Sequence, residues 1–208
     1  MRLWEATSGQ ERSTLRGHEQ PVYALAFSPD GKRAAMASYS SPNDETIEVF
    51  DFDNATGIFS NRIGLPTPAY FQTYGLEFSP SGKILYTTAN PGLNQVFQWN
   101  LEAGTTADII ASQTLIGTTL GDALTMQLGP DKKVYCAMYY SNYVGVINDP
   151  DSLGLACNWV TQGVNLSPKT CLLGLPNFLA SFFLSVSVEH ICFGDSTFFQ
   201  LSDSSAYA

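Results

Sequence analysis

The sequence predicts an all-β protein built from repeated four-stranded antiparallel sheets, the blades of a partial or small β-propeller with about three to four blades. Three observations lead to this fold class. A proline-containing turn recurs about every 50 residues, and an apolar strand pattern recurs with the same period. The composition agrees, because 12% of the residues are aromatic and only 14% are charged, as suits pleated and half-buried strands.

The recurring turn is the clearest element of the repeat. Residues 27–32 (FSPDGK) return at 78–83 (FSPSGK) and, in altered form, at 128–133 (LGPDKK). Proline presets its own φ angle and glycine accepts a left-handed conformation, so this pattern is typical of a tight turn. Apolar runs precede and follow each copy. The sequence therefore predicts strand, turn and strand three times, and these residues shape the backbone without performing chemistry.

A second strand pattern follows each of these hairpins. It covers residues 47–53, 95–101 and 144–148, and residues 2–5 resemble an earlier copy. Residues 63–65 and 109–116 are candidates for a fourth strand. Four short strands per period make one propeller blade. We therefore expect a run of blades over residues 1–188, divided into a partial blade at 1–20, three blades at about 21–66, 70–116 and 122–166, and a partial blade at 168–188.

The first complete unit resembles a WD-repeat blade. It begins with Gly17-His18 and ends with residues 44–51 (DETIEVFD), where that family has an Asp-x-Thr-Ile-x-x-Trp-Asp ending. The resemblance implies a buried hydrogen-bonded network in which His18, Ser38 and Asp44 fill three places. Phe50 stands where the family has tryptophan, and it has no N–H to donate. The resemblance therefore implies an incomplete network in this blade.

From about residue 39 to residue 200 the chain also resembles the propeller repeats of bacterial surface proteins associated with gliding motility and type IX secretion. The segments that carry this resemblance are 74–83, 127–131, 145–150, 153–158 and 173–178. It implies an extracellular or cell-surface protein, with the cytoplasm as the alternative. Residues 192–199 are similar to the opening strand of an Ig-like (PKD-type) domain. Residues 189–208 are accordingly expected to be the start of a truncated Ig-like domain or a disordered tail.

Charge and hydropathy exclude several classes of protein. The net charge is −9 and no cluster of Lys and Arg occurs, so we expect no nucleic-acid partner. The first twenty residues are polar and predict no signal peptide in this chain. The uncharged stretch at 170–188 is interrupted by Gly174 and Pro176, so we expect two buried strands there and no membrane span.

Residues capable of catalysis or metal binding are sparse. The chain has two histidines, His18 and His190, and its four cysteines form no Cys-x-x-Cys pair. Both buried free thiols and disulfides remain open for these cysteines. The acidic segment 51–57 lacks the glutamate that closes a calcium loop, since Arg62 takes the twelfth position. We therefore expect no enzyme, no cofactor and no metal site.

Aromatic residues near predicted loop ends are the better candidates for binding. These are Tyr70, Phe71, Tyr139, Tyr140 and Tyr143. Tyrosine is favoured at interfaces because it is large, stiff and amphipathic. The alternative is that these rings fill the core between blades.

The sequence thus predicts a non-catalytic module that binds protein or glycan through propeller loops, as part of a bacterial surface or secreted protein. Two alternatives remain: a propeller enzyme of the lactonase or lyase type, and an intracellular WD-repeat scaffold. An unclosed ring leaves strand edges open to self-association. One way to close it is a fourth blade, with inner strands from residues 169–188 and outer strands from residues 2–16.

Overall fold

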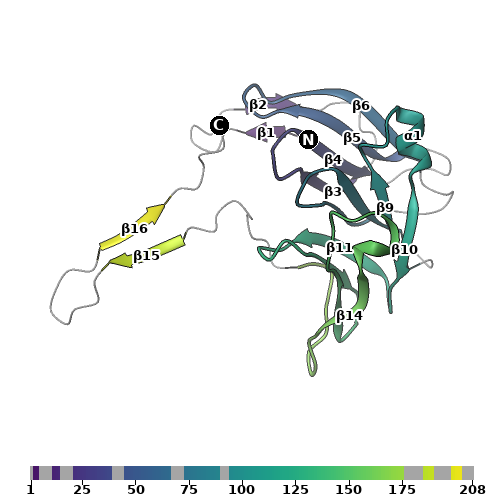
Figure 1. Cartoon of the computed structure of the whole chain (residues 1–208), viewed down its shortest axis with the longest axis vertical. Helices are drawn as coiled ribbons and strands as arrows, with labels where there is room; N and C mark the ends of the chain where they lie inside the picture. The colour runs from purple at the N-terminus through teal and green to yellow at the C-terminus, as the bar shows by residue number, and fades with distance from the viewer. Residues whose placement is uncertain are drawn as a thin grey trace. The chain divides into compact units, whose positions relative to one another are not determined.

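The computed structural model describes residues 2–4, 11–14, 21–38, 45–66, 73–89, 94–175, 185–189 and 198–202. Strands dominate these residues, and three four-stranded antiparallel sheets account for most of them. The chain divides into two compact units, Met1–Leu175 and Pro176–Ala208. The all-β class predicted from the sequence is confirmed (Figure 1).

The first sheet, blade 1, orders its strands as they follow in the chain. They are β3 (Val22–Phe27), β4 (Arg33–Ser38), β5 (Glu45–Asp53) and β6 (Ile58–Pro66). Strand β4 is buried along four consecutive residues, 34–37, because both faces of the sheet carry apolar side chains.

Blade 2 repeats this order. Its strands are β7 (Leu76–Phe78), β8 (Ile84–Ala89), β9 (Gln95–Asn100) and β10 (Thr114–Thr118). A short helix, α1 (Thr106–Ala111), precedes β10. The strand predicted at 109–116 is therefore wrong in its first half. Thr105 and Asp108 form a reciprocal capping box that begins a helix at this point.

Blade 3 has the same order once more. Its strands are β11 (Ala123–Leu128), β12 (Val134–Met138), β13 (Tyr143–Ile147) and β14 (Trp159–Asn165). The β13–β14 connection contains a 3-10 helix, η1 (Gly154–Cys157).

The repeated turns have the geometry that their residues predict. Gly31 and Gly82 adopt positive φ angles of 67° and 70°. Ser28 and Ser79 close the turns, because their N–H groups donate to the carbonyls of Arg33 and Ile84 and their Oγ atoms accept from the N–H groups of the same two residues. In blade 3 the corresponding bond runs from Gly129 to Lys133, so this turn is one residue shorter.

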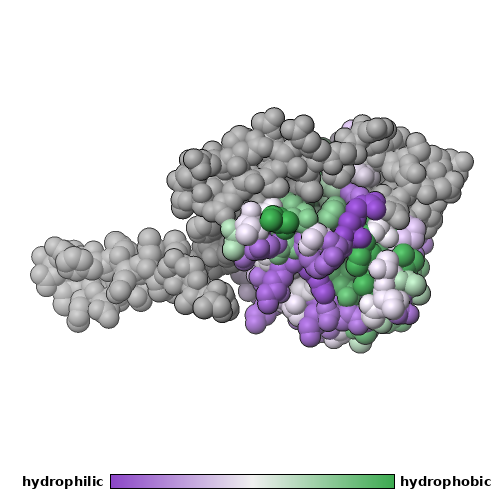
Figure 2. Space-filling model, turned by 90° about the horizontal axis from the view of Figure 1, so that it is seen from above, coloured by the Kyte–Doolittle hydropathy of each residue, from purple (hydrophilic) through white to green (hydrophobic). Residues whose placement is uncertain are grey.

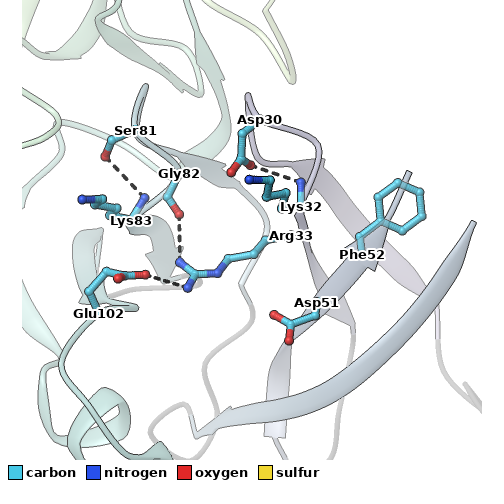
Figure 3. Close-up of a pocket in the computed structure, with 9 residues that line it drawn as sticks. All are labelled: Asp30, Lys32, Arg33, Asp51, Phe52, Ser81, Gly82, Lys83 and Glu102. Atoms are coloured by element: carbon cyan, nitrogen blue, oxygen red, sulfur yellow. Dashed lines mark hydrogen bonds and ion pairs between the residues drawn. The ribbon is translucent and has the colours of Figure 1, made fainter. Parts of the chain in front are cut away.

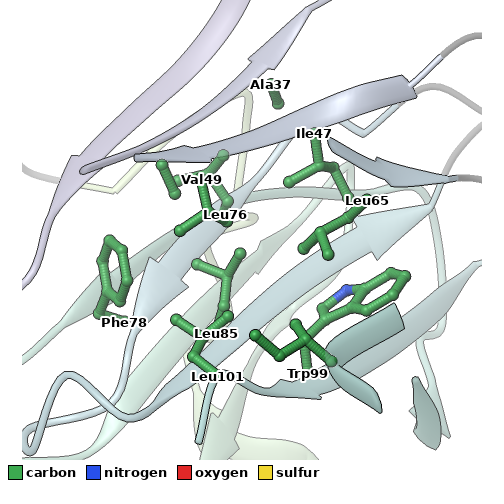
Figure 4. Close-up of a cluster of buried hydrophobic side chains, with 11 residues drawn as sticks. Ala37, Ile47, Val49, Leu65, Leu76, Phe78, Leu85, Trp99 and Leu101 are labelled. Carbon is green, nitrogen blue, oxygen red and sulfur yellow. The ribbon is translucent and has the colours of Figure 1, made fainter. Parts of the chain in front are cut away.

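The blades pack face to face through apolar clusters. One cluster joins blades 1 and 2 around Val49, Leu65, Phe78, Leu85 and Trp99 (Figure 4). A second cluster joins blades 2 and 3 and includes Tyr86, Val96, Met126, Val134 and Ile147. The innermost strands β3, β7 and β11 contact one another in sequence, as the inner strands of adjacent blades do.

Each end of the chain contains one two-stranded antiparallel pair. In the described residues β1 (Arg2–Trp4) pairs with β2 (Glu11–Thr14). In the second unit β15 (Ser185–Glu189) pairs with β16 (Phe198–Ser202). Residues 166–175 lie against blade 3 without forming a strand, since Cys171 exchanges backbone bonds with Tyr140 and Ser141. Much of residues 2–16 and 176–188 lies outside the described residues, so the fourth blade stays a prediction.

Candidate functional site

Each blade presents two ends for contact with other molecules. One end, the turn end, carries the repeated turns 28–32, 79–83 and 129–133 together with the connections between the third and fourth strands. The opposite end, the tyrosine end, carries the connections between the second and third strands and those between blades. Because the strands are antiparallel, this division follows from the strand order alone.

A charged hollow of about 450 Å³ lies at the turn end between blades 1 and 2 (Figure 3). Its lining combines three basic and three acidic side chains with Phe52 and two small residues. The lining residues are Asp30, Lys32, Arg33, Asp51, Phe52, Ser81, Gly82, Lys83 and Glu102. Equal numbers of opposite charges give the hollow no net charge to select a charged ligand.

Arg33 crosses this hollow and ties the two blades together. Its guanidinium donates to the Gly82 carbonyl at 3.2 Å and to Glu102 Oε1 at 2.6 Å. Figure 3 shows the arginine side chain reaching from blade 1 to both groups on blade 2. The Arg33 guanidinium is therefore occupied by bonds within the protein, and we assign the hollow a role in the packing of blades 1 and 2.

The predicted hydrogen-bonded network is only partly visible. His18 and Asp44 lie outside the described residues. Ser38 is half-buried at the end of β4, where it pairs with Val22. Phe50 is buried and lies edge-on to Phe59, with ring centroids 5.9 Å apart.

Blade 2 contains a bond of the kind that Phe50 cannot make. The indole Nε1 of Trp99 donates to Thr87 Oγ1 at 3.2 Å, and both residues are buried. Strand pairing aligns Phe78↔Leu85 with Phe27↔Ala34, so Met36 rather than Ser38 takes the place of Thr87 in blade 1. This pair was not predicted from the sequence, although Trp99 in residues 95–101 takes the position that Phe50 has in residues 47–53.

Two of the candidate binding aromatics stand together at the tyrosine end. Tyr139 and Tyr140 form the β12–β13 turn, with 37% and 67% of their surfaces exposed and their ring centroids 4.3 Å apart. Tyr143 is half-buried in β13. Tyr70 and Phe71 lie outside the described residues.

The tyrosine turn is held by two neighbouring segments. The Tyr139 N–H donates to the Asp122 carbonyl at 3.0 Å, and the Tyr140 N–H donates to the Cys171 carbonyl at 3.1 Å. Both neighbouring segments carry exposed leucines, Leu120, Leu172 and Leu173, each between 56% and 58% exposed. We call Leu120, Tyr139, Tyr140, Leu172 and Leu173 the tyrosine surface. Large apolar groups gathered in this way are typical of contact sites for other proteins.

Within the described ranges, no group of three or more His, Cys, Asp or Glu side chains could hold a metal ion. Asp53 instead caps its own turn by accepting bonds from the Ala55 N–H and the Thr56 hydroxyl. No helix in the described part of the chain is long and apolar enough to cross a membrane.

Comparison with known structures identifies the class of fold. The chain is similar to a chain in the crystal structure of the mitotic checkpoint complex, at 17% identity with a TM-score of 0.50, over 80% of this chain and 45% of that one. It is also similar to hydrazine synthase of Kuenenia stuttgartiensis, at 19% identity with a TM-score of 0.52, over 69% of this chain and 50% of that one. The three blades are part of a β-propeller.

Sequence comparison identifies the type of repeat. Residues 9–51 match the family described as WD domain, G-beta repeat, and this match covers β2, β3, β4 and most of β5. The WD-type character predicted for the first blade is confirmed.

The relatives are longer proteins from eukaryotes. The periodic tryptophan protein 2 homolog of Schizosaccharomyces pombe is 28% identical over 67% of this chain and 15% of its own length. Protein TOPLESS of Arabidopsis thaliana is 27% identical over 50% of this chain and 9% of its own length. Coronin-7 of Rattus norvegicus is 35% identical over 24% of this chain and 5% of its own length. The chain therefore spans a small part of the curated relatives it matches.

Proposed function

We propose that this chain is a scaffold-type module that binds protein partners, with WD-repeat blades presenting exposed apolar side chains at the blade ends. The tyrosine surface is the observation that carries this proposal. It places two tyrosines and three leucines on turns that a rigid sheet supports, and binding residues are commonly arranged in this way.

The comparisons favour the intracellular WD-repeat scaffold over the bacterial surface module. The relatives named above come from yeast, plant and rat, and none of them is bacterial. The described cysteines, Cys136, Cys157 and Cys171, are free and buried, which suits a reducing compartment. The resemblance to gliding-motility proteins, binding of glycan and self-association through strand edges stay predictions.

The proposal predicts that the tyrosine surface contacts a partner directly. A photo-reactive amino acid at position 140 should form a discrete crosslink to one protein in an extract of the source organism. The matched control carries the same group at Ile58, which is 59% exposed on blade 1. A crosslink at position 140 alone supports the proposal, whereas no crosslink there, or the same products at both positions, overturns it.

A substitution measures how much Tyr140 contributes. Tyr140 has a positive φ of 55°, which asparagine tolerates, so Tyr140→Asn removes the ring without straining the turn. We expect the crosslinked partner to bind about 10- to 30-fold more weakly, as for an aromatic hot spot. Ile58→Asn should leave its affinity unchanged.

A further inference from the structure

The β13–β14 loop, residues 148–158, exposes two leucines at the turn end of blade 3. Leu153 is 54% exposed and Leu155 is 78% exposed. Both belong to the region of η1, and Leu115 on the contacting strand β10 is a further 44% exposed. Exposed apolar side chains that stand close together, unlike single ones, are typical of contact sites for other proteins.

A buried polar network on blade 2 fixes this loop. The Tyr86 hydroxyl donates to the Pro150 carbonyl at 2.8 Å, and Gln98 Nε2 donates to the Ser152 carbonyl at 2.7 Å. Gln98 Oε1 accepts from the Gly154 N–H at 2.7 Å. Both side chains are nearly inaccessible to solvent, at 0% and 2% exposed. The amide of Gln98 is thus used on both sides to hold the loop, while Nε2 also donates to Tyr86 at 2.9 Å.

Backbone bonds inside the loop, and one more bond to blade 2, also hold the loop in place. The Asp149 N–H donates to the Cys157 carbonyl at 3.0 Å, and Cys157 is fully buried. The Asn158 N–H donates to the Leu155 carbonyl at 3.1 Å. Asp151 Oδ1 accepts from the Ser81 N–H on blade 2 at 3.0 Å. The two leucines therefore project from a backbone that is ordered before any partner arrives.

The charge of this end suggests what kind of partner fits. The loop itself carries two exposed carboxylates, Asp149 and Asp151, and no basic residue, and the chain has a net charge of −9. The adjacent turn carries Lys132 and Lys133 beside the exposed Asp131, and Lys133 Nζ donates to Asn148 Oδ1 at 2.9 Å, so the loop and this turn together hold three carboxylates and two ammonium groups. An acidic surface attracts a basic partner and disfavours an acidic one.

We propose that the β13–β14 loop is a preformed docking knob for a segment of a partner protein that carries large apolar side chains next to Lys or Arg. The inference rests on the proposed function, since it names a second contact site of the same module and the class of partner it takes. Preorganisation makes the knob effective, because no ordering of the loop opposes binding. It lies at the opposite end of the blades from Tyr140.

Binding of a fluorescent synthetic peptide made of leucine and lysine tests the proposal. We expect it to bind the whole chain more tightly than a matched peptide in which glutamate replaces lysine, and to weaken as salt is added. Leu155→Ser should reduce its affinity about tenfold, whereas the control Ile58→Ser, at an apolar residue that is 59% exposed on blade 1, should leave it unchanged. Equal binding of the two peptides, or no effect of Leu155→Ser, would overturn the proposal.

A second variant tests the preformed character of the loop. Gln98→Leu keeps both leucines but removes the bonds to Ser152 and Gly154, so peptide affinity should fall several-fold. Hydrogen exchange should rise at residues 152–158 and stay unchanged in blade 1. Unchanged affinity in Gln98→Leu would overturn a preformed knob. These measurements do not involve Tyr140. If the crosslinking experiment at position 140 fails, the result for the β13–β14 loop is therefore still informative.

Discussion

The two junctions between the blades are held together by different kinds of interaction. Blades 1 and 2 meet through an apolar cluster, and the hydrogen bonds of Arg33 to Gly82 and Glu102 join them at the exposed edge. Blades 2 and 3 meet through a comparable cluster, but buried polar groups bridge them as well. Apolar packing is tolerant of direction, whereas hydrogen bonds specify one geometry. The second junction therefore fixes the β13–β14 loop as well as joining two sheets.

The largest effect is expected from Trp99 in the first junction. Trp99→Ala removes the largest fully buried side chain among the described residues and leaves a cavity against Leu85 and Leu65. We expect the free energy of unfolding to fall by about 3–5 kcal/mol, measured by urea denaturation. A loss below about 1 kcal/mol would contradict an apolar junction. Thr87→Val is the control that removes the indole's acceptor while keeping the ring.

A smaller effect is expected from the polar part of the second junction. Tyr86→Phe leaves the Pro150 carbonyl without its donor and Gln98 Nε2 without one acceptor. The free energy of unfolding should fall by about 1–3 kcal/mol, because a buried group loses its partner. Hydrogen exchange should rise in residues 148–158 more than in blade 1. Uniform destabilisation of all three blades would show that the network does not act on this loop in particular.

Glu77 should make the second junction sensitive to pH. Burial raises the pKa of Glu77 to about 7 from its ordinary 4.5, although N–H bonds from Leu128 and Phe78 act in the opposite direction. The folded state thus holds a proton that the unfolded chain releases. The stability that this proton provides is full below about pH 4.5 and is lost as the pH rises to 7.

The magnitude follows from comparing wild type with Glu77→Gln across this pH range. We expect the free energy of unfolding of the wild type to fall by about 1–2 kcal/mol relative to the variant between pH 4.5 and 7. Parallel curves for the two proteins would contradict the assignment. Glu102→Gln, an exposed carboxylate at the first junction, serves as the control.

The smallest effect is expected at the exposed edge of the first junction. Arg33 and Glu102 are 27% and 48% exposed, so water screens their attraction. Arg33→Ala should lower the free energy of unfolding by no more than about 1 kcal/mol, and added salt should reduce the difference. A loss as large as that of Trp99→Ala would mean that the ion pair, and not the cluster, joins the two blades.

Local features of the fold could be predicted from the sequence because local chemistry determines them. Proline and glycine in 27–32 and 78–83 predict tight turns, so two hairpins followed directly, and the third followed from the altered copy at 128–133. Helix α1 was missed because its apolar residues, Ile109 and Ile110, fit a strand as well as a helix. The capping pair Thr105 and Asp108 decides between the two.

Features that depend on distant partners could not be predicted. Thr87 and Trp99 meet only once the register of β8 and β9 is known. The family resemblance implied Ser38 for the network in blade 1, whereas strand pairing puts Met36 at the position equivalent to Thr87. Gln98 holds residues more than fifty positions away, and no local pattern marks such a contact. Tyr139 and Tyr140 could be named as candidates because a turn at the end of a hairpin exposes its side chains.

The close approach of the inner strands β7 and β11 at Gly75 limits which blade can occupy the middle position of the chain. A Cβ atom there would lie 2.0 Å from the Leu124 carbonyl oxygen, and the same turn-based alignment places Ala24 at this position in blade 1. A copy of blade 1 moved into the middle place would bring a methyl group where none fits. The blades share one strand order, but one blade cannot replace another without a change in sequence. If blade 1 were duplicated into the middle position, Ala24 would have to be replaced by glycine.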